Sequence, residues 1–190
     1  NLRLTTDRNT EQDWLKTNLA KFTAMLQGQR DLSLVGRLLL SELAPLVGAQ
    51  QGVIYQMLGG EGPPSLGLLS AYADDGERSH QLRLSVGEGL VGQCATDKRR
   101  IQINDLPADV APIRSALFSS APRSIVVLPV LFEGQVKAVI ELATVGEFSE
   151  LQTMFLEQLT ASIGIVLNSI EATMQTEALL GQSQQLAAEL

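Results

Sequence analysis

The sequence predicts an α+β fold, in which helices cover an antiparallel sheet. Short apolar runs rich in Val, Ile and Leu are separated by Gly- and Pro-containing turns, and one pair of runs flanks Glu133-Gly134, a hairpin signal. Helical periodicity precedes and follows these runs, which favours two layers over a parallel βαβ arrangement. The 190 residues fit one domain at about 31–170, an N-terminal linker helix at 1–30 and a C-terminal helical extension at 171–190.

The first predicted helix covers about residues 10–30. Thr10, followed by Asp13 three residues later, is typical of a helix start. An apolar seam with spacings of three and four then follows, comprising Leu15, Leu19, Phe22 and Leu26. Two interpretations stay open: the seam packs on its own domain, or it contacts the same helix of a second copy.

The globular part begins with an amphipathic helix over residues 34–43, which Pro45 and Gly48 end or kink. Turn residues bound each of the apolar runs that follow, and a short helix is expected at 90–97. The predicted strands cover residues 52–58, 66–73, 81–84, 100–104, 124–132 and 135–144.

The last helix begins at Ser149, which forms a capping box with Gln152. Nothing in the sequence stops it before residue 190, so it is about 60 Å long and extends beyond its own domain. Its seam contains Leu159, Ile163, Val166 and Ile170, and a polar stretch at 171–177 interrupts the pattern. We expect a parallel homodimer through the seams of the first and last helices.

The charge distribution limits the classes of partner. All fourteen Lys and Arg residues lie at or before Lys137, and the net charge is −7, so nucleic-acid binding is not expected. No apolar run approaches the roughly twenty residues of a membrane span, so we expect no membrane insertion of this segment. The single cysteine, Cys94, fits a reducing cytoplasm.

Three glycines, Gly87, Gly89 and Gly92, form a G-x-G-x-x-G pattern. A dinucleotide site would need a full helix after the pattern, but this helix ends near Lys98. Glu88 would also lie where a phosphate should bind. We therefore interpret the glycines as a structural turn that needs positive φ or close backbone approach.

Residues 86–109 resemble the signature of GAF domains, small-molecule sensor modules of bacterial signalling proteins. The matching features are the glycine turn, the short helix, the strand Ile101-Gln102-Ile103 and the turn Asp105-Leu106-Pro107. The resemblance implies a six-stranded antiparallel sheet flanked by helices.

Longer segments, such as 125–143 and 155–168, are similar to the GAF domain of hybrid sensor histidine kinases, placed between HAMP helices and a kinase core. This resemblance implies a sensor in a two-component phosphorelay, whose parent protein is anchored in the inner membrane. Because phospho-acceptor and ATP-binding motifs are absent from the sequence, we expect a regulatory segment rather than an enzyme.

Several ligands of GAF subfamilies are disfavoured. Bilin needs a cysteine, and residues 108–122 contain none; the Asn-Lys pattern of cyclic-nucleotide binders is also missing. His80 has no second His or Cys at ligand spacing, which argues against haem or a metal ion. The identity of any cofactor stays open.

The connector at 105–123 is the predicted ligand site, because long connections are often functional lids. Arg114 and Arg123 could hold a carboxylate or phosphate, with Ser115 and Ser124 as donors; alternatively, both arginines are solvated. Phe118 either contacts the ligand or closes the core.

Cys94 is expected to be a small buried residue, with a redox or ligand-contacting thiol as the alternative. Two functions therefore stand: a sensor that binds a small effector, and a ligand-free module for dimerisation and signal transmission. A cysteine-based redox sensor is a third and less favoured function. The cysteine-based sulfoxide reductases of the GAF type need more than one redox cysteine, and Cys94 stands alone.

Overall fold

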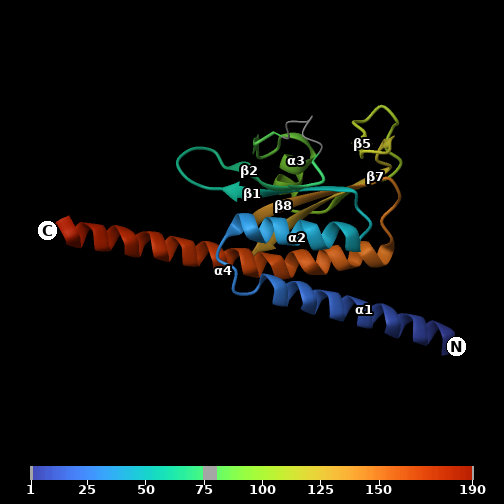
Figure 1. The fold of residues 1–190 in the computed structure, drawn as a ribbon, viewed down its shortest axis with the longest axis horizontal. Helices are drawn as coiled ribbons and strands as arrows, with labels where there is room; N and C mark the ends of the chain where they lie inside the picture. Colours follow the sequence, from blue (N-terminus) through green and yellow to red (C-terminus); the bar gives the residue numbers. More distant parts are fainter. Residues whose placement is uncertain (1, 75–80, 190) are drawn as a thin grey trace.

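A six-stranded antiparallel sheet forms the centre of the fold (Figure 1), as the sequence predicts. The computed structural model describes residues 2–74 and 81–189, so His80 lies outside the described residues. The elements, in chain order, are α1 (Leu2–Leu26), α2 (Leu32–Leu46), β1 (Gln51–Leu58), β2 (Ser65–Tyr72), β3 (Arg83–Ser85), α3 (Gly89–Asp97), β4 (Ile101–Ile103), β5 (Ile113–Arg114), β6 (Ser119–Ser120), β7 (Ser124–Phe132), β8 (Gln135–Thr144) and α4 (Glu150–Glu189).

The strand order is β3-β2-β1-β8-β7-β4, and every pair is antiparallel. The predicted hairpin at β7–β8 is confirmed, with φ of 50° at Glu133 and 78° at Gly134. Two consecutive positive φ angles suit the tight turn of a twisted hairpin. The first and last strands of the domain, β1 and β8, pair at the middle of the sheet, and the segment with α3 joins the two edge strands, β3 and β4, across one face.

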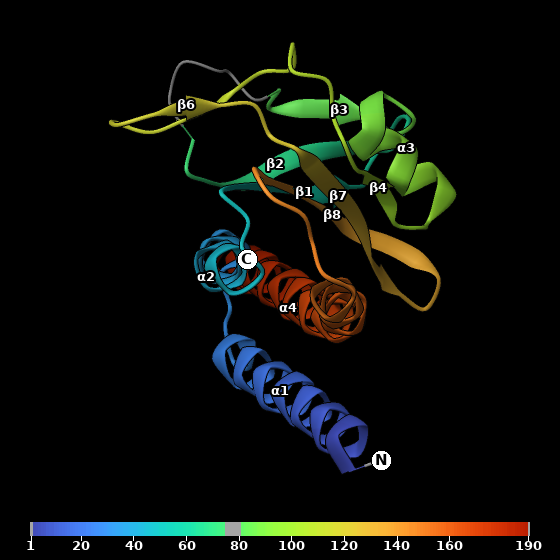
Figure 2. The same cartoon turned by 90° about the vertical axis from the view of Figure 1, so that its right-hand side faces the viewer.

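The helices cover the two faces of the sheet unequally (Figure 2). On one face α2 and α4 pack against the sheet, and α1 forms a further layer outside α4. Their apolar residues make the larger core, which includes Ile54, Ile140 and Leu142. On the opposite face, α3 packs with Val53, Tyr55 and their neighbours into a smaller core. This second face is only partly covered by helix.

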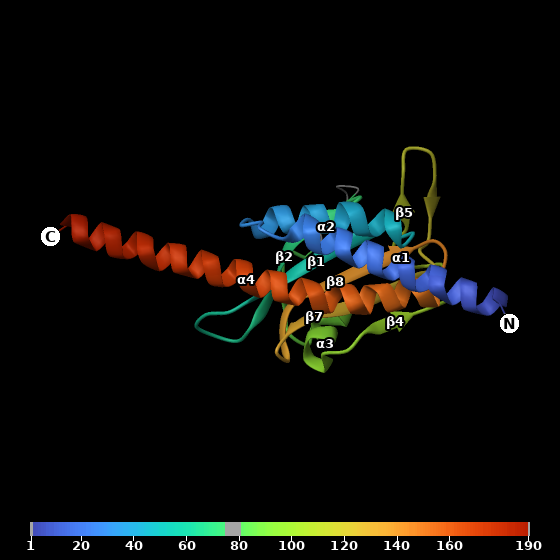
Figure 3. The same cartoon turned by 90° about the horizontal axis from the view of Figure 1, so that it is seen from below.

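The apolar seam of α1 packs on α4 of the same chain. The Trp14 and Phe22 rings lie 5.2 and 5.8 Å from the Phe155 ring between centroids. The two helices run in the same direction at a shallow angle (Figure 3). The residues assigned to a dimer interface are thereby packed within one chain: Leu15, Leu19, Phe22, Leu26, Leu159, Ile163, Val166 and Ile170. The spacing of apolar residues predicts a helix contact, but it does not show whether the partner helix belongs to the same chain or to a second copy. Here these residues pack within the same chain.

α4 is one continuous helix that leaves the domain. Its capping box is confirmed: the Gln152 amide donates to Ser149 Oγ at 3.1 Å, and the Ser149 amide donates to Gln152 Oε1 at 2.8 Å. Beyond Glu171 its described side chains are exposed. This part of the helix extends away from the domain (Figure 1). One window of α4 has the length and apolarity of a membrane span, but 50% of it is buried in the domain, as for a core helix.

Three elements differ from the prediction. α1 begins at Leu2 instead of Thr10, whose hydroxyl donates to the Thr6 carbonyl inside the helix and so caps nothing. α2 is longer than the predicted 34–43 and holds Pro45 in its last turn, and it ends before Gly48, as expected. The connector at 105–123 contains a small second sheet, β5–β6, that the sequence analysis missed.

Candidate functional site

The glycine turn before α3 is structural, as predicted. Gly89 has φ of +64°, and a Cβ on Gly92 would lie 2.6 Å from the Ser85 carbonyl oxygen. The Glu88 carboxylate accepts a hydrogen bond from the Ser85 amide at 2.9 Å. This contact ties the turn to the end of β3, and the Glu88 side chain makes no capping hydrogen bond to α3.

Cys94 lies on α3 in the smaller core, with no exposed surface. Burial, with a smaller contribution from Asp97, raises the pKa of its thiol from 9.0 to about 12. The thiol donates a hydrogen bond to the Arg99 carbonyl at 3.3 Å. A protonated, buried thiol is a poor nucleophile, which argues against the redox and ligand-contacting interpretations of Cys94.

A cavity of about 290 Å³ lies between the sheet and the connector, on the face opposite α2 and α4. Its floor is formed by β1, β7 and β8, and its cover includes Leu106, Val110 and Pro122. The sequence predicts a ligand site at this connector, and the cavity lies there. Its volume is near the lower end of the range for ligand pockets, about 300–1,000 Å³.

The polar side chains of the cavity come from the sheet. Tyr55, Gln51 and Glu141 line it, whereas Tyr72 borders it at the edge and packs against the larger core. The Tyr55 hydroxyl donates to the Gln81 carbonyl at 3.0 Å. Burial raises the Tyr55 pKa, and the negative charge of Glu141 raises it further, because phenolate formation beside a carboxylate is unfavourable.

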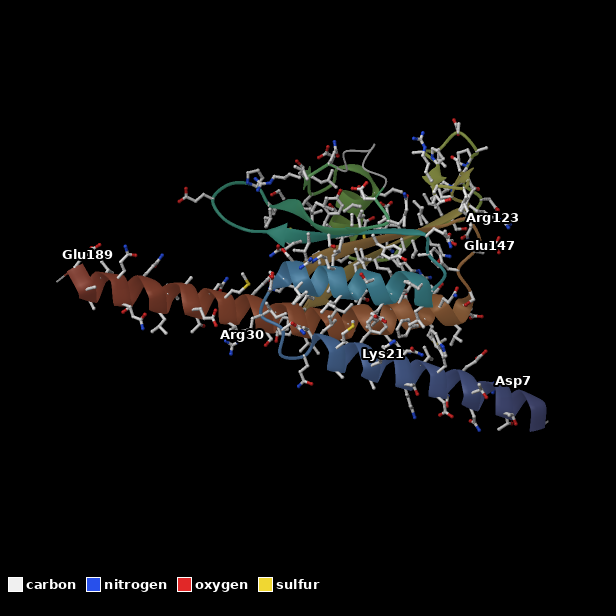
Figure 4. The ribbon with its side chains drawn as sticks, in the orientation of Figure 1. Asp7, Lys21, Arg30, Arg123, Glu147 and Glu189 are labelled. Carbon is white, nitrogen blue, oxygen red and sulfur yellow. The ribbon has the colours of Figure 1, made fainter. Side chains whose placement is uncertain are left out.

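The residues predicted to bind a ligand mostly lie elsewhere. Arg123 forms ion pairs with Asp105 at 3.3 Å and with Glu147 at 2.8 Å (Figure 4). These contacts join the start of the connector to the loop before α4. Arg123 and Arg114 are both absent from the cavity lining, and the expected carboxylate or phosphate clamp is not formed there.

The remaining predicted contacts are also displaced. Ser115 Oγ accepts hydrogen bonds from the Leu117 and Phe118 amides, and so closes the β5–β6 hairpin. Phe118, near the tip of this hairpin, is 51% exposed. Ser124 is buried and, among the described residues, its Oγ has no hydrogen-bond partner. By strand alternation Ser124 faces the helices, whereas its neighbour Ile125 lines the cavity.

Three residues at the cavity were not predicted from the sequence: Tyr55, Tyr72 and Glu141. A signal for Glu141 was present, since it is a lone charge within the apolar run Ala138–Ala143. The tyrosines carried no comparable signal, because their approach to the connector depends on strand pairing between residues far apart in the chain.

Comparison with known families decides the identity of the fold. Residues 29–168 match the GAF domain family. The chain belongs to the GAF family. A comparison with curated proteins gave no significant match. In GAF domains generally the fold serves as a module for small-ligand sensing and regulation.

Solved structures of other GAF domains have the same fold. The GAF domain of a phosphoenolpyruvate-protein phosphotransferase from Coxiella burnetii has a TM-score of 0.68 at 16% identity, over 85% of this chain and 96% of that one. Free methionine-R-sulfoxide reductase from Neisseria meningitidis has a TM-score of 0.63 at 17% identity, over 82% and 89%. The nlh2 GAF domain of A. aeolicus has a TM-score of 0.62 at 19% identity, over 82% and 97%. These similarities establish the fold, and one of the neighbours is an enzyme.

A larger, open groove of about 720 Å³ lies elsewhere on this GAF domain, beside α4 and the β7–β8 hairpin. Two of its cations are already used: Lys98 Nζ donates to the Gly134 carbonyl at 2.8 Å, and Arg100 pairs with Glu157 at 2.9 Å. Because these groups hold the domain together, the connector cavity is the better candidate for a ligand site.

Proposed function

We propose that this GAF domain is a sensor that binds a small molecule in the connector cavity and passes its occupancy to α4. One observation carries the proposal. Arg123 bonds Asp105, at the start of the cavity cover, and Glu147, in the loop that leads into α4. A movement of the cover on ligand binding would therefore act directly on the start of the long helix.

β8 gives a second connection between the cavity and α4. Glu141 and Ala143 line the cavity, β8 ends at Thr144, and α4 begins at Glu150. A ligand shifts the state of α4 only by the difference between its affinities for the two states. The short link makes such a difference physically reasonable, because the strand that contacts the ligand also leads into the output helix.

The output of the proposed sensor is the kinase core of a two-component histidine kinase, with HAMP helices on the input side. The described side chains at 5–13 of α1 and at 172–189 of α4 are exposed, and the two helix ends point in opposite directions (Figure 1). This arrangement suits a module inserted between an input and an output helix. The proposed setting is the cytoplasmic side of an inner membrane.

A homodimer is part of the proposal, through a surface of α4 that faces away from the core. Ile165, Ala172, Leu179 and Leu186 are exposed and follow one another at intervals of seven residues. This outer stripe supplies one of the two apolar positions that each heptad of a coiled coil needs. In this proposal the stripe is the dimer contact, in place of the seam residues of α1 and α4 that pack inside the chain.

We propose a regulatory role and no catalysis for this segment. The buried thiol of Cys94, with its pKa of about 12, does not support cysteine chemistry. Among the described residues, no group of three or more His, Cys, Asp or Glu side chains could hold a metal ion. A test for free methionine-R-sulfoxide reductase activity would decide the question, and turnover would contradict this part of the proposal.

The sensor is tested by fusing the chain to a histidine kinase core and measuring autophosphorylation with and without cell extract of low molecular mass. We expect a change in rate on addition. Arg123→Gln should abolish that change while leaving folding intact, whereas Arg83→Gln, an exposed arginine on β3, should have no effect. An unchanged response in Arg123→Gln would contradict transmission through this contact.

Mass spectrometry of the denatured, freshly purified protein separates the sensor from the alternative, a ligand-free module for dimerisation and transmission. The outer stripe of α4 favours that alternative, because it needs no ligand to act. A stoichiometric small molecule supports the sensor. Its absence, with no response to the extract in the fusion assay, supports the ligand-free module.

A further inference from the structure

The outer edge of β7 is only partly covered by β4. Among the described strands, β4 pairs with β7 at residues 125–127, whereas β8 pairs with β7 along its whole length. The rest of β7, residues 128–132, therefore lies at a free edge of the sheet. The open groove of about 720 Å³ runs along this edge, with α4 on its other side.

The backbone of this edge is poorly suited to a further strand. Pro129 has no amide proton, and proline is tolerated in a sheet where its position faces a free edge. The Leu131 carbonyl oxygen is covered by the backbone of α4 at Gly164. An added peptide strand would find no partner at either place. An occupant of the groove must therefore be held by side chains.

The charged side chains of the groove leave one cation free. Arg100 is paired with Glu157 at 2.9 Å. Lys98 Nζ donates to the Gly134 carbonyl, which places its charge beside the hairpin turn that carries Glu133. Within the part of the chain that the structure describes, Arg99 forms no ion pair. The charged residues that line the groove are Lys98, Arg99, Arg100, Glu133 and Glu157.

Arg99 is also the free hydrogen-bond donor of the groove. Its side chain is exposed and lies at the end of the lane that β4 occupies beside β7. On the α4 side, the Thr160 hydroxyl already donates to the Glu157 carbonyl at 3.0 Å. A guanidinium binds a carboxylate through two parallel N–H bonds. The free group therefore selects an anion with two adjacent oxygens.

The remaining lining is apolar. Ile165 is 62% exposed, so covering it with an apolar chain would be favourable. We propose that the groove binds a monocarboxylate with an apolar chain, whose carboxylate is held by Arg99 and whose chain lies along the β7 edge against Ile165. The apolar residues that line the groove are Leu128, Pro129, Leu131, Phe132, Ala161 and Ile165.

This groove is separate from the connector cavity, so the inference does not rest on the proposed sensor function. Ile165 also begins the outer stripe of α4. A bound chain would therefore compete with a second copy for this one residue, and the groove would connect a metabolite with the pairing of the helices.

Three probes of equal chain length test the class: octanoate, 1-octanol and octylammonium, titrated by calorimetry into the full chain at pH 7. We expect octanoate to bind about fivefold more tightly than octanol, the upper end for a solvent-accessible ion pair, and octylammonium to bind more weakly than octanol. Arg99→Gln should remove the preference of octanoate over octanol. Arg37→Gln, an equal charge change at an exposed position of α2, should preserve it.

Ala161→Trp locates the binding, because the added ring would fill the groove beside α4. Ala161 is exposed, so the variant should stay folded by circular dichroism while both octanoate and octanol bind more weakly. Octanol or octylammonium binding as tightly as octanoate would overturn the anionic class. A preference for octanoate that survives Arg99→Gln, or binding that Ala161→Trp does not change, would overturn the site. If none of the probes binds, the proposal fails, and the mass spectrometry above still judges the sensor separately.

Discussion

Two glycines of α4 have opposite environments, although both are helical. A Cβ on Gly164 would collide with the Leu131 carbonyl oxygen of β7, while one on Gly181 would meet nothing within 4 Å. Gly164 thus permits the helix to touch the backbone of the sheet. Gly181 gives no such contact and only weakens the helix.

Gly164→Ala is expected to lower the free energy of unfolding by about 1–3 kcal/mol, because the helix must move away from β7. Gly181→Ala is the matched control, and it should leave stability unchanged or raise it by up to about 1 kcal/mol. Urea denaturation of both variants at one protein concentration measures the difference. Equal effects of the two substitutions would show that Gly164 is not a contact position.

Cys94 gives the protein a pH dependence in the alkaline range. Its thiol pKa is about 12 in the folded chain, against 9.0 ordinarily, so above pH 9 the unfolded chain loses the proton first. Stability from this group is therefore fully present below pH 9 and falls as the pH rises. Between pH 8 and pH 10 the wild type should lose about 1 kcal/mol more than Cys94→Ala.

Denaturation of the wild type and Cys94→Ala at pH 8 and pH 10 tests this prediction. The comparison of the two pH values within each protein cancels the loss of packing that the substitution itself causes. Parallel pH curves would mean that the thiol titrates near its ordinary pKa in the folded chain.

At the scale of elements, the sequence predicted best where local pattern and tertiary pairing agree. The bounds of β7 and β8 match the predicted ranges, because a strong hairpin turn lies between two long apolar runs. β5 and β6 have only two residues each, too few to show alternation. Residues 5–9 of α1 are exposed and polar, so periodicity gave no sign of a helix there.

The candidate site was predicted in place but not in composition. The length of the connector pointed to a cover, and the cavity lies beneath it. Its chemistry comes from Tyr55 and Glu141, whose nearness depends on β1 pairing with β8 across more than eighty residues of sequence. Arg123 was predicted to bind a ligand because its carboxylate partners could not be recognised from the sequence. Asp105 and Glu147 lie far from it along the chain, and only the fold brings them together.

Graded truncation of α4 tests how far the domain depends on its extension. Removal of residues 178–190 keeps the Lys137–Glu171 and Arg30–Glu177 ion pairs, so the free energy of unfolding should change by less than about 0.5 kcal/mol. Removal of 171–190 breaks both pairs and should cost about 1 kcal/mol. Thermal and urea denaturation measure both variants. If the variant that lacks residues 178–190 were unfolded, the extension would belong to the core.

At the scale of the whole molecule, the positive charges of the domain neutralise the acidic helix. Arg100 pairs with Glu157 at 2.9 Å, Lys137 with Glu171 at 3.3 Å and Arg30 with Glu177 at 3.6 Å. α4 has no cation of its own. Because three of its five carboxylates are paired within the chain, a second α4 can approach the outer stripe with less repulsion.

Two neighbouring leucines test the proposed dimer. Leu179 lies on the outer stripe, and Leu180, about 100° away around the helix, does not. The two are 67% and 58% exposed, so both accept a charge without loss of core packing. Leu179→Glu should give monomers at tens of micromolar protein by light scattering, because like charges would face each other across the seam. Leu180→Glu should leave the dimer intact.

A monomeric wild type at that concentration would contradict the dimer. If both leucine variants dissociated equally, the outer stripe would not be the dimer contact. The two copies would then pair through another surface.

The continuity of α4 makes the helix a lever with its fulcrum at the sheet. The nineteen residues from Glu171 to Glu189 extend the rod by about 28 Å beyond the last buried turn. A tilt of about 5° at the domain would move the far end by about 2.5 Å, which is more than the 1–2 Å helix shifts found at many allosteric interfaces. A displacement of the cavity cover too small to alter the fold would thus be large where α4 ends.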